Sequence, residues 1–177
     1  MPLARIRCVL RLSVVAAAIC VLAAGCGHSG RRVGGHGLTL AVPHGWHTWV
    51  PLVPPGGGAI TDPGTRIVAV SAPFSVVGHT CEPFDYGFRS GAVGIVLVEW
   101  KKTSDIGPLP PRPRRFTSKT LPVRRHELEC WDGPGGGIQF ADHGRDFGAY
   151  ILLGPAAPPK LAEQARKVLD TLRVRSS

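Results

Sequence analysis

The stretch IQFADHGRDFGAYILLG, residues 138–154, carries the signal for a pair of adjacent strands. Two apolar segments flank His143, Gly144 and Arg145, and a glycine at this place can adopt the positive φ that tight turns require. Apolar side chains alternate along the first segment, whereas apolar and small residues occupy both faces of the second. The stretch therefore predicts a β-hairpin whose second strand is buried on both sides.

Further strand signals lie upstream of this hairpin. GAVGIVLVEW, residues 91–100, is strongly apolar and rich in β-branched side chains, so it predicts a central strand. GLTLAV, residues 37–42, and RIVAVSAPF, residues 66–74, predict two more strands. We expect CEPFDYGFRSG, residues 81–91, to be irregular or to hold a short helix, and GPGGG, residues 133–137, to form a turn.

The C-terminal stretch PPKLAEQARKVLDTLRV, residues 158–174, predicts an amphipathic helix. Leu161, Ala165, Val168 and Leu172 recur at helical spacing, and the paired prolines suit a helix entrance. Strands followed by one terminal helix, rather than alternating strands and helices, predict the α+β class. We therefore expect a mostly antiparallel, twisted sheet with the C-terminal amphipathic helix packed on it.

Three pieces of the chain carry a resemblance to a known fold family. They are PHGW at residues 43–46, FADHGRDFGAYILLG at residues 140–154 and AEQARKVLDTLRV at residues 162–174. With the strand order above, they resemble the PsbP-like α/β/α sandwich of actinobacterial extracytoplasmic lipoproteins, including LpqN-like envelope proteins. The resemblance implies a sandwich of this type in the cell envelope. The Pro/Arg-rich segment 107–115 departs from that layout.

Residues 1–25 have the pattern of a signal peptide. Arginines precede SVVAAAICVLAAG, residues 13–25, an apolar run that is shorter than the about 20 residues of a membrane helix. Ala24, Gly25 and Cys26 resemble the end of a bacterial lipobox, which implies a lipoprotein with a diacylglyceryl group on the Cys26 sulfur and acyl chains such as palmitate. The alternative is an ordinary signal peptide with an incidental cysteine.

The lipobox interpretation also predicts the domain organisation. Residues 26–37 show no hydrophobic period and predict a flexible tether, followed by a single α+β domain over residues 38–177. The expected location is the cell membrane, where the protein is lipid-anchored on the extracytoplasmic face.

The cysteines are consistent with an oxidising compartment. Cys8 and Cys20 leave with the signal peptide, and Cys26 takes the lipid. Cys81 and Cys130 remain as an even pair, which predicts a disulfide bond. Two buried free thiols or a catalytic cysteine are the alternatives.

The formal net charge is +9 at pH 7, and basic residues gather in one part of the chain. The group comprises Arg112, Arg114, Arg115, Lys119, Arg124 and Arg125. On a membrane-tethered protein, such a group predicts contact with an anionic lipid surface. A solvated face is the alternative. Nucleic acid is a poor partner outside the cell, and no recognition motif for it is present.

The sequence shows no catalytic or metal-binding signature. It has no G-x-S-x-G elbow, and HELEC at residues 126–130 lacks the second histidine of a zinc protease motif. We expect no cofactor. Arg145 stands between Asp142 and Asp146, where it either binds an anion or bridges the two acids. The four tryptophans either line a cleft or belong to the core.

Together these features predict a non-enzymatic binding or accessory module of the cell envelope. The alternatives are a protein that binds an envelope lipid or glycolipid, and an envelope hydrolase that uses a histidine and an aspartate. The expected partners are the membrane, through Cys26, and an envelope protein or lipid. A large apolar cavity favours lipid binding, whereas a hydrogen-bonded histidine–carboxylate pair beside an open cleft favours a hydrolase.

Overall fold

The computed structural model describes residues 30–51, 63–77, 84–101 and 107–176. Strands account for 46% of the described residues and helix for 8%. The predicted α+β class, with an α/β/α sandwich built on a C-terminal helix, is therefore wrong: this part of the chain is mostly β, with one short helix. The reason is that segments expected to be irregular, including much of the tether and the GPGGG turn, form strands.

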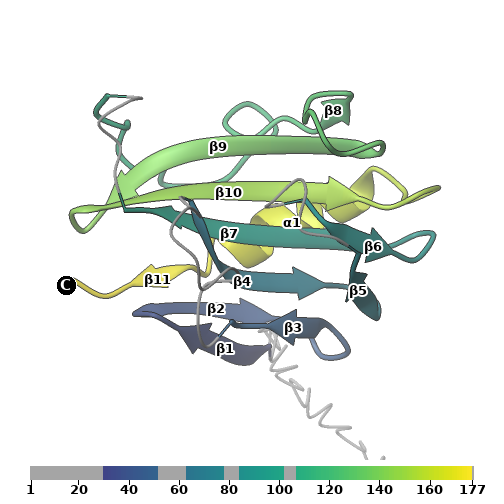
Figure 1. Ribbon diagram of the computed structural model, residues 1–177, viewed down its shortest axis with the longest axis horizontal. Helices are drawn as coiled ribbons and strands as arrows, with labels where there is room; N and C mark the ends of the chain where they lie inside the picture. Colours follow the sequence, from purple (N-terminus) through teal and green to yellow (C-terminus); the bar gives the residue numbers. More distant parts are fainter. Residues whose placement is uncertain (1–29, 52–62, 78–83, 102–106, 177) are drawn as a thin grey trace, which may run out of the picture.

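Six antiparallel strands form the main sheet, in the order β3-β4-β7-β10-β9-β8 (Figure 1). Their bounds are His47–Trp49 (β3), Gly64–Val70 (β4), Val93–Trp100 (β7), Arg145–Leu153 (β10), Pro134–Asp142 (β9) and Arg124–Arg125 (β8). β7 lies between β4 and β10, with Ile95 opposite Ile151. The prediction of a central strand in residues 91–100 is confirmed.

β9 and β10 form the predicted hairpin. Asp142 is paired with Arg145, and the two residues between them, His143 and Gly144, have φ values of 51° and 72°. Positive φ at both central positions defines a type I′ turn, whose twist matches that of the flanking strands. The predicted hairpin in residues 138–154 is confirmed, although its first strand begins earlier than expected.

A second hairpin of the same kind occupies the predicted tether. β1 (Arg31–Gly35) pairs with β2 (Leu38–Val42) across His36 and Gly37, whose φ values are 55° and 75°. The prediction of a flexible tether is therefore wrong from β1 onward. The segment is rich in glycine and arginine and shows no hydrophobic period, so the turn at His36 and Gly37 was not predicted. Residues 26–29 and the predicted signal peptide lie outside the described residues.

The predicted turn at GPGGG is also wrong, because β9 runs through these glycines. A Cβ at Gly136 would lie 1.8 Å from the carbonyl oxygen of Pro122, and a Cβ at Gly137 would lie 2.6 Å from the ring of Tyr150. Glycine usually weakens a strand interior. Here it leaves the space that a crossing loop and an aromatic ring occupy against the strand.

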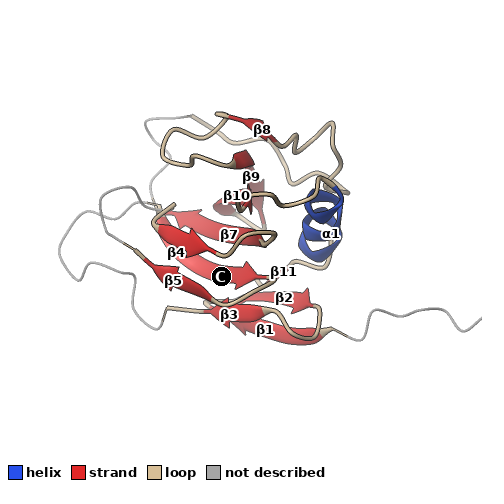
Figure 2. Cartoon of the chain, turned by 90° about the vertical axis from the view of Figure 1, so that its right-hand side faces the viewer, coloured by secondary structure: helices blue, strands red, loops and turns tan. Residues whose placement is uncertain are grey.

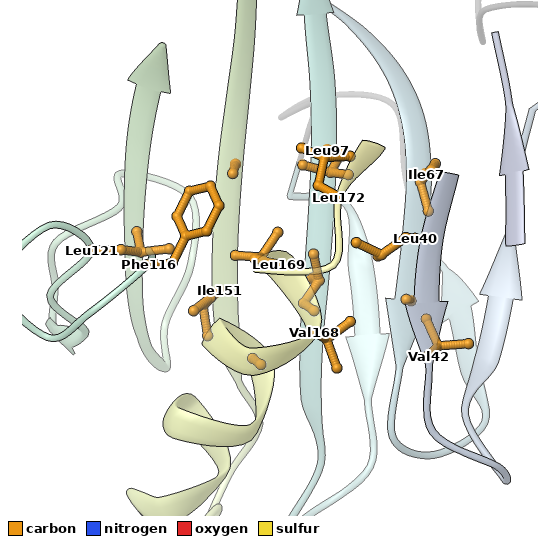
Figure 3. Packing of buried hydrophobic residues seen from close by; sticks show 14 of the residues in the cluster. Leu40, Val42, Ile67, Leu97, Phe116, Leu121, Ile151, Val168, Leu169 and Leu172 are labelled. Atoms are coloured by element: carbon orange, nitrogen blue, oxygen red, sulfur yellow. The ribbon is translucent and has the colours of Figure 1, made fainter. Parts of the chain in front are cut away.

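The C-terminal helix α1 (Lys160–Leu169) is present and lies on one side of the main sheet (Figure 2). Figure 3 shows Val168 and Leu169 between Phe116 on one side and Leu40 on the other. These side chains belong to one buried cluster that α1 shares with β7, β10 and β2. The helix therefore joins the main sheet to the first hairpin.

The chain ends in a short edge strand. β11 (Arg173–Val174) pairs with β2 and completes a three-stranded sheet in the order β1-β2-β11. Just before it, Thr171 Oγ1 accepts a hydrogen bond from the Ala41 N–H at 2.8 Å. Among the described residues, no helix is long and apolar enough to cross a membrane.

The two faces of the main sheet bury different kinds of side chain. The helix face, which meets α1 and the β1–β2 hairpin, is mainly aliphatic. On the strands it includes Ile67, Ile95, Leu97, Phe147 and Ile151. The opposite face carries a layer of partly buried rings, and we call it the aromatic face. On the strands it includes Val68, Val96, Val98, Tyr150 and Leu152.

Candidate functional site

Two short strands cover part of the aromatic face. β5 (Phe74–Val76) and β6 (Tyr86–Phe88) pair in antiparallel orientation. The rings of Phe74 and Tyr86 make an edge contact with centroids 6.0 Å apart, and those of Phe88 and Trp131 lie 5.0 Å apart. The result is a continuous row of aromatic contacts from β5 to the segment before β9.

The strand character of β6 follows from its alternation. Phe84, Tyr86 and Phe88 recur at every second residue, which places their side chains on one side of an extended chain. A Cβ at Gly94 of β7 would lie 2.2 Å from the Phe88 ring, so this glycine makes room for the ring. The expectation of an irregular or helical segment at residues 81–91 is therefore wrong for β6. The period-two spacing of its aromatics was the available signal.

A cavity of ≈ 600 Å³ adjoins this row of rings. Its lining comes from Val77 and from three segments that are distant in sequence, within residues 84–88, 125–134 and 153–157. Phe84, Phe88 and Trp131 supply aromatic surface to it. The volume falls within the range of about 300–1,000 Å³ that is usual for small-molecule sites. We call it the aromatic cavity.

Two residues that line the aromatic cavity have an unusual backbone conformation. His126 and Ala156 have φ values of 55° and 56°. Within the described residues, the other non-glycine residues with positive φ are His36 and His143, and type I′ turns account for both. Neither His126 nor Ala156 lies in such a turn between paired strands. Strain of about 1–3 kcal/mol per residue tends to cluster at ligand sites.

Charged side chains stand at the rim of the aromatic cavity. Arg125, His126 and Asp132 are exposed, and in the described part of the chain their side chains have no hydrogen bond or ion pair. Asp85 is buried and engaged. The rim can therefore donate hydrogen bonds to a ligand and accept them from it, while the rings contact an apolar part.

Tyr150 lies under the rings of this face. Its ring meets that of Phe84 at an interplanar angle of 88°, with centroids 5.0 Å apart. Burial raises the pKa of Tyr150, against the opposite effect of a hydrogen bond with Gln139. The phenol is therefore protonated at neutral pH, where it acts as a packing residue rather than as a base.

The cysteines are placed only in part. Cys130 lines the aromatic cavity, and its sulfur is disulfide-bonded. The predicted partner, Cys81, lies outside the described residues, so the Cys81–Cys130 pairing stays a prediction. Cys26 also lies outside them, and its lipid attachment stays a prediction. No group of three or more histidine, cysteine or acidic side chains in the described segments could hold a metal ion.

The first part of the predicted basic group is held in the fold. Pro111 forms a bridge with Ala141, which places residues 110–112 along β9. Arg112 Nη1 donates to the carbonyl oxygen of Leu172 at 3.0 Å and lies 3.0 Å from Asp142 Oδ2. The guanidinium of Arg112 therefore has a structural role.

The rest of the group is exposed but divided. Arg124 and Arg125 form β8 opposite Pro134 and Gly135, at the far end of β9 from the bridge, roughly 20 Å away at the usual rise per residue. Arg124 is 3.7 Å from Glu127. The remaining exposed members are Arg114, Arg115 and Lys119. Arg112 and the two arginines of β8 therefore lie at opposite ends of β9, and contact of the group with an anionic surface stays a prediction.

Arg145 belongs to a partly buried ion network on the helix face. Its Nε and Nη2 donate to the two oxygens of Glu99 at 2.7 and 2.9 Å, and Arg66, at a β-bulge, donates from Nε to the same carboxylate at 2.8 Å. Burial opposes ionisation of Glu99, but the hydrogen bonds and charges of Arg145 and Arg66 hold its pKa below the ordinary value. Neither role predicted for Arg145 included Glu99, which is 46 residues away.

The tryptophans divide between core and cavity. Trp46 is 7% exposed and belongs to the core of the helix face, whereas Trp131 lines the aromatic cavity. Rings beside exposed polar side chains are the usual composition of a small-molecule binding pocket. Comparisons with family models, with curated proteins and with solved structures found no match to this chain.

Proposed function

We propose that the protein is a lipid-anchored, non-enzymatic binding module on the extracytoplasmic face of the cell membrane, and that the aromatic cavity is its ligand site. The anchor is the lipidated Cys26, as the lipobox-like sequence implies. The ligand is a small amphipathic molecule of the cell envelope, such as a lipid or glycolipid.

The observation that carries the ligand site is the coincidence of volume and strain. The cavity measures ≈ 600 Å³, and both strained residues that hairpin turns do not explain, His126 and Ala156, line it. Backbone strain persists where the surrounding structure holds it in place, and it commonly does so at binding sites. An accidental void between loops gives no physical reason for strained residues to gather around it.

The composition of the lining supports an amphipathic ligand. Phe84, Phe88 and Trp131 offer ring surface, which gives a large apolar contact at little cost in side-chain entropy. Arg125 and Asp132 at the rim are exposed and suited to a polar group. A purely apolar ligand would leave these charges unused.

A hydrolase is the weaker alternative. His143 Nδ1 lies 2.7 Å from Asp142 Oδ1, which is the kind of pair that a hydrolase uses. The pair sits at an exposed hairpin turn, however, and neither residue lines the aromatic cavity. Asp142 Oδ2 also lies 3.0 Å from Arg112 Nη1, so this carboxylate takes part in an ion pair of the fold.

The test is titration with the fluorescent dye 1-anilinonaphthalene-8-sulfonate, an amphipathic probe with an aromatic body and an anionic group. Trp131→Ala should weaken binding at least about fivefold, because loss of a ring contact is worth about 1 kcal/mol or more. Trp49→Ala is the matched control, since Trp49 packs on the aromatic face without lining the cavity. It should bind the probe as the wild type does.

Equal probe binding by wild type and Trp131→Ala would reject the cavity as the site. Mass spectrometry of molecules that accompany the gently purified protein extends the test, and loss of the same species from Trp131→Ala identifies the natural ligand. Circular dichroism of each variant checks that the fold is retained.

A further inference from the structure

We infer that the domain docks on an anionic bilayer through a basic face formed by Arg32, Lys167 and Arg173, beside the start of β1. The inference rests on the lipid anchor of the proposed function, and it adds which surface of the domain meets the membrane. It also differs from the basic group expected from the sequence.

The first argument is the length of chain between anchor and fold. Cys26 precedes Gly30, the first described residue, by four positions. Even a fully extended chain covers at most about 3.6 Å per residue, so four residues reach about 14 Å. A lipid on Cys26 therefore holds the start of β1 close to the head groups, and the surface around Gly30 faces the bilayer.

The second argument is the position of three cations around that point. Lys167 of α1 and Gly30 line the same cavity of ≈ 200 Å³, together with Thr171. Arg32 of β1 and Arg173 of β11 line a neighbouring cavity of ≈ 260 Å³, again with Thr171. The three cations thus surround the junction between β2 and the end of α1, and they come from three different elements.

The third argument is that these cations are available. Arg32, Lys167 and Arg173 are exposed, and among the described residues their side chains have no hydrogen bond or ion pair. Asp170 also lines the second cavity, but its Oδ1 accepts a hydrogen bond from the Phe116 N–H at 2.7 Å. Three cations and one engaged acid leave an excess of positive charge.

Two further groups bear on the charge of this face. Glu163 on α1 is bound by Arg166, whose Nη1 lies 3.1 Å from its carboxylate. Arg115 immediately precedes Phe116 and adds an exposed cation at the margin of the face. The face is cationic, and the anchor holds it close to the bilayer. An anionic lipid surface is therefore the partner of opposite charge.

The experiment measures co-sedimentation with vesicles. The mature chain, residues 26–177 with Cys26→Ser so that no lipid can attach, is mixed with phosphatidylcholine vesicles that contain or lack phosphatidylglycerol. We expect binding only to the anionic vesicles, with release at high salt. Each cation at such a surface strengthens adsorption about fivefold, so the double variant R32Q/K167Q should bind about 25-fold more weakly.

The double variant R89Q/K160Q is the matched control. It has the same net charge, both residues are exposed, and neither belongs to the basic face. Its binding should change less than about twofold. Equal weakening in both double variants would show a general charge effect and overturn the inference, as would undiminished binding of R32Q/K167Q.

A separate measurement keeps the anchor and the face distinguishable. The mass of wild-type protein extracted from membranes shows whether Cys26 carries acyl chains. An unacylated protein would contradict the anchor, and with it the distance argument for the face. An acylated protein with undiminished R32Q/K167Q binding would overturn the face and leave the anchor standing.

Discussion

The helix face and the aromatic face of the main sheet share the same strands but differ in how completely they are covered. On the helix face, Ile67, Ile95 and Ile151 are fully buried beneath α1 and the first hairpin. On the aromatic face, Phe84 and Phe88 are only partly buried and border a cavity of ≈ 600 Å³. The difference teaches that one sheet can be packed completely on one face and leave a cavity on the other. On the proposed function, stability and binding are therefore separated between the two faces.

Leu169→Ala should give the largest effect and tests whether the helix face carries the stability. Leu169 is fully buried in the core cluster, so truncation should lower the free energy of unfolding by about 4 kcal/mol. Urea unfolding measures this. Leu128→Ala on the aromatic face, where the side chain is partly buried, should lower it by only about 1 kcal/mol. Equal losses would break the comparison.

Glu99→Gln should have the second-largest effect on stability. It should lower the free energy of unfolding by about 3 kcal/mol near neutral pH, because the largely buried Arg66 and Arg145 would lose their anionic partner. The pKa of Glu99 is lowered in the folded state, so its contribution is present above the unfolded-state pKa and is lost as pH falls through the folded value. Thermal unfolding across acidic pH should show a flatter dependence for Glu99→Gln. Glu127→Gln, in the exposed pair with Arg124, is the control and should change the free energy of unfolding little.

Val77→Ser should have the smallest effect on stability. It tests whether a change at the border of the aromatic cavity alters probe binding without altering stability. Val77 is 67% exposed at the border of the aromatic cavity, so the free energy of unfolding should change by less than about 0.5 kcal/mol. Probe binding should weaken about twofold, because apolar surface is lost at the site. A destabilised variant with normal probe binding would contradict the separation of roles.

Two turns have the same sequence, His-Gly, but only one of them was predicted. His143-Gly144 was recognised because apolar strands flank it, and the hairpin was predicted correctly. His36-Gly37 forms the same type I′ turn, but glycines and arginines precede it, and a tether was predicted instead. The local turn signal was equal in both. The difference was the hydrophobic period of the flanking residues, which is weak when one strand is short and mostly exposed.

The sequence predicts less of the candidate site than of the fold. Its lining joins residues 84–88, 125–134 and 153–157, which no spacing rule connects. The sequence offers Trp131 as a cleft-lining residue, whereas His126 carries no signal beyond an incomplete zinc motif. The positive φ of His126 and Ala156 depends on how the surrounding loops meet the sheet.

The sequence by itself determined the central strand, the β9–β10 hairpin and the C-terminal helix, because β-branched runs, a glycine turn and helical spacing are local properties of the chain. Only the tertiary structure decided that β9 runs through Gly136 and Gly137, because the groups that require glycine there, Pro122 and Tyr150, come from elsewhere in the chain. The same holds for the Glu99 network and for the aromatic cavity. Each depends on groups that become neighbours only when the sheet has formed.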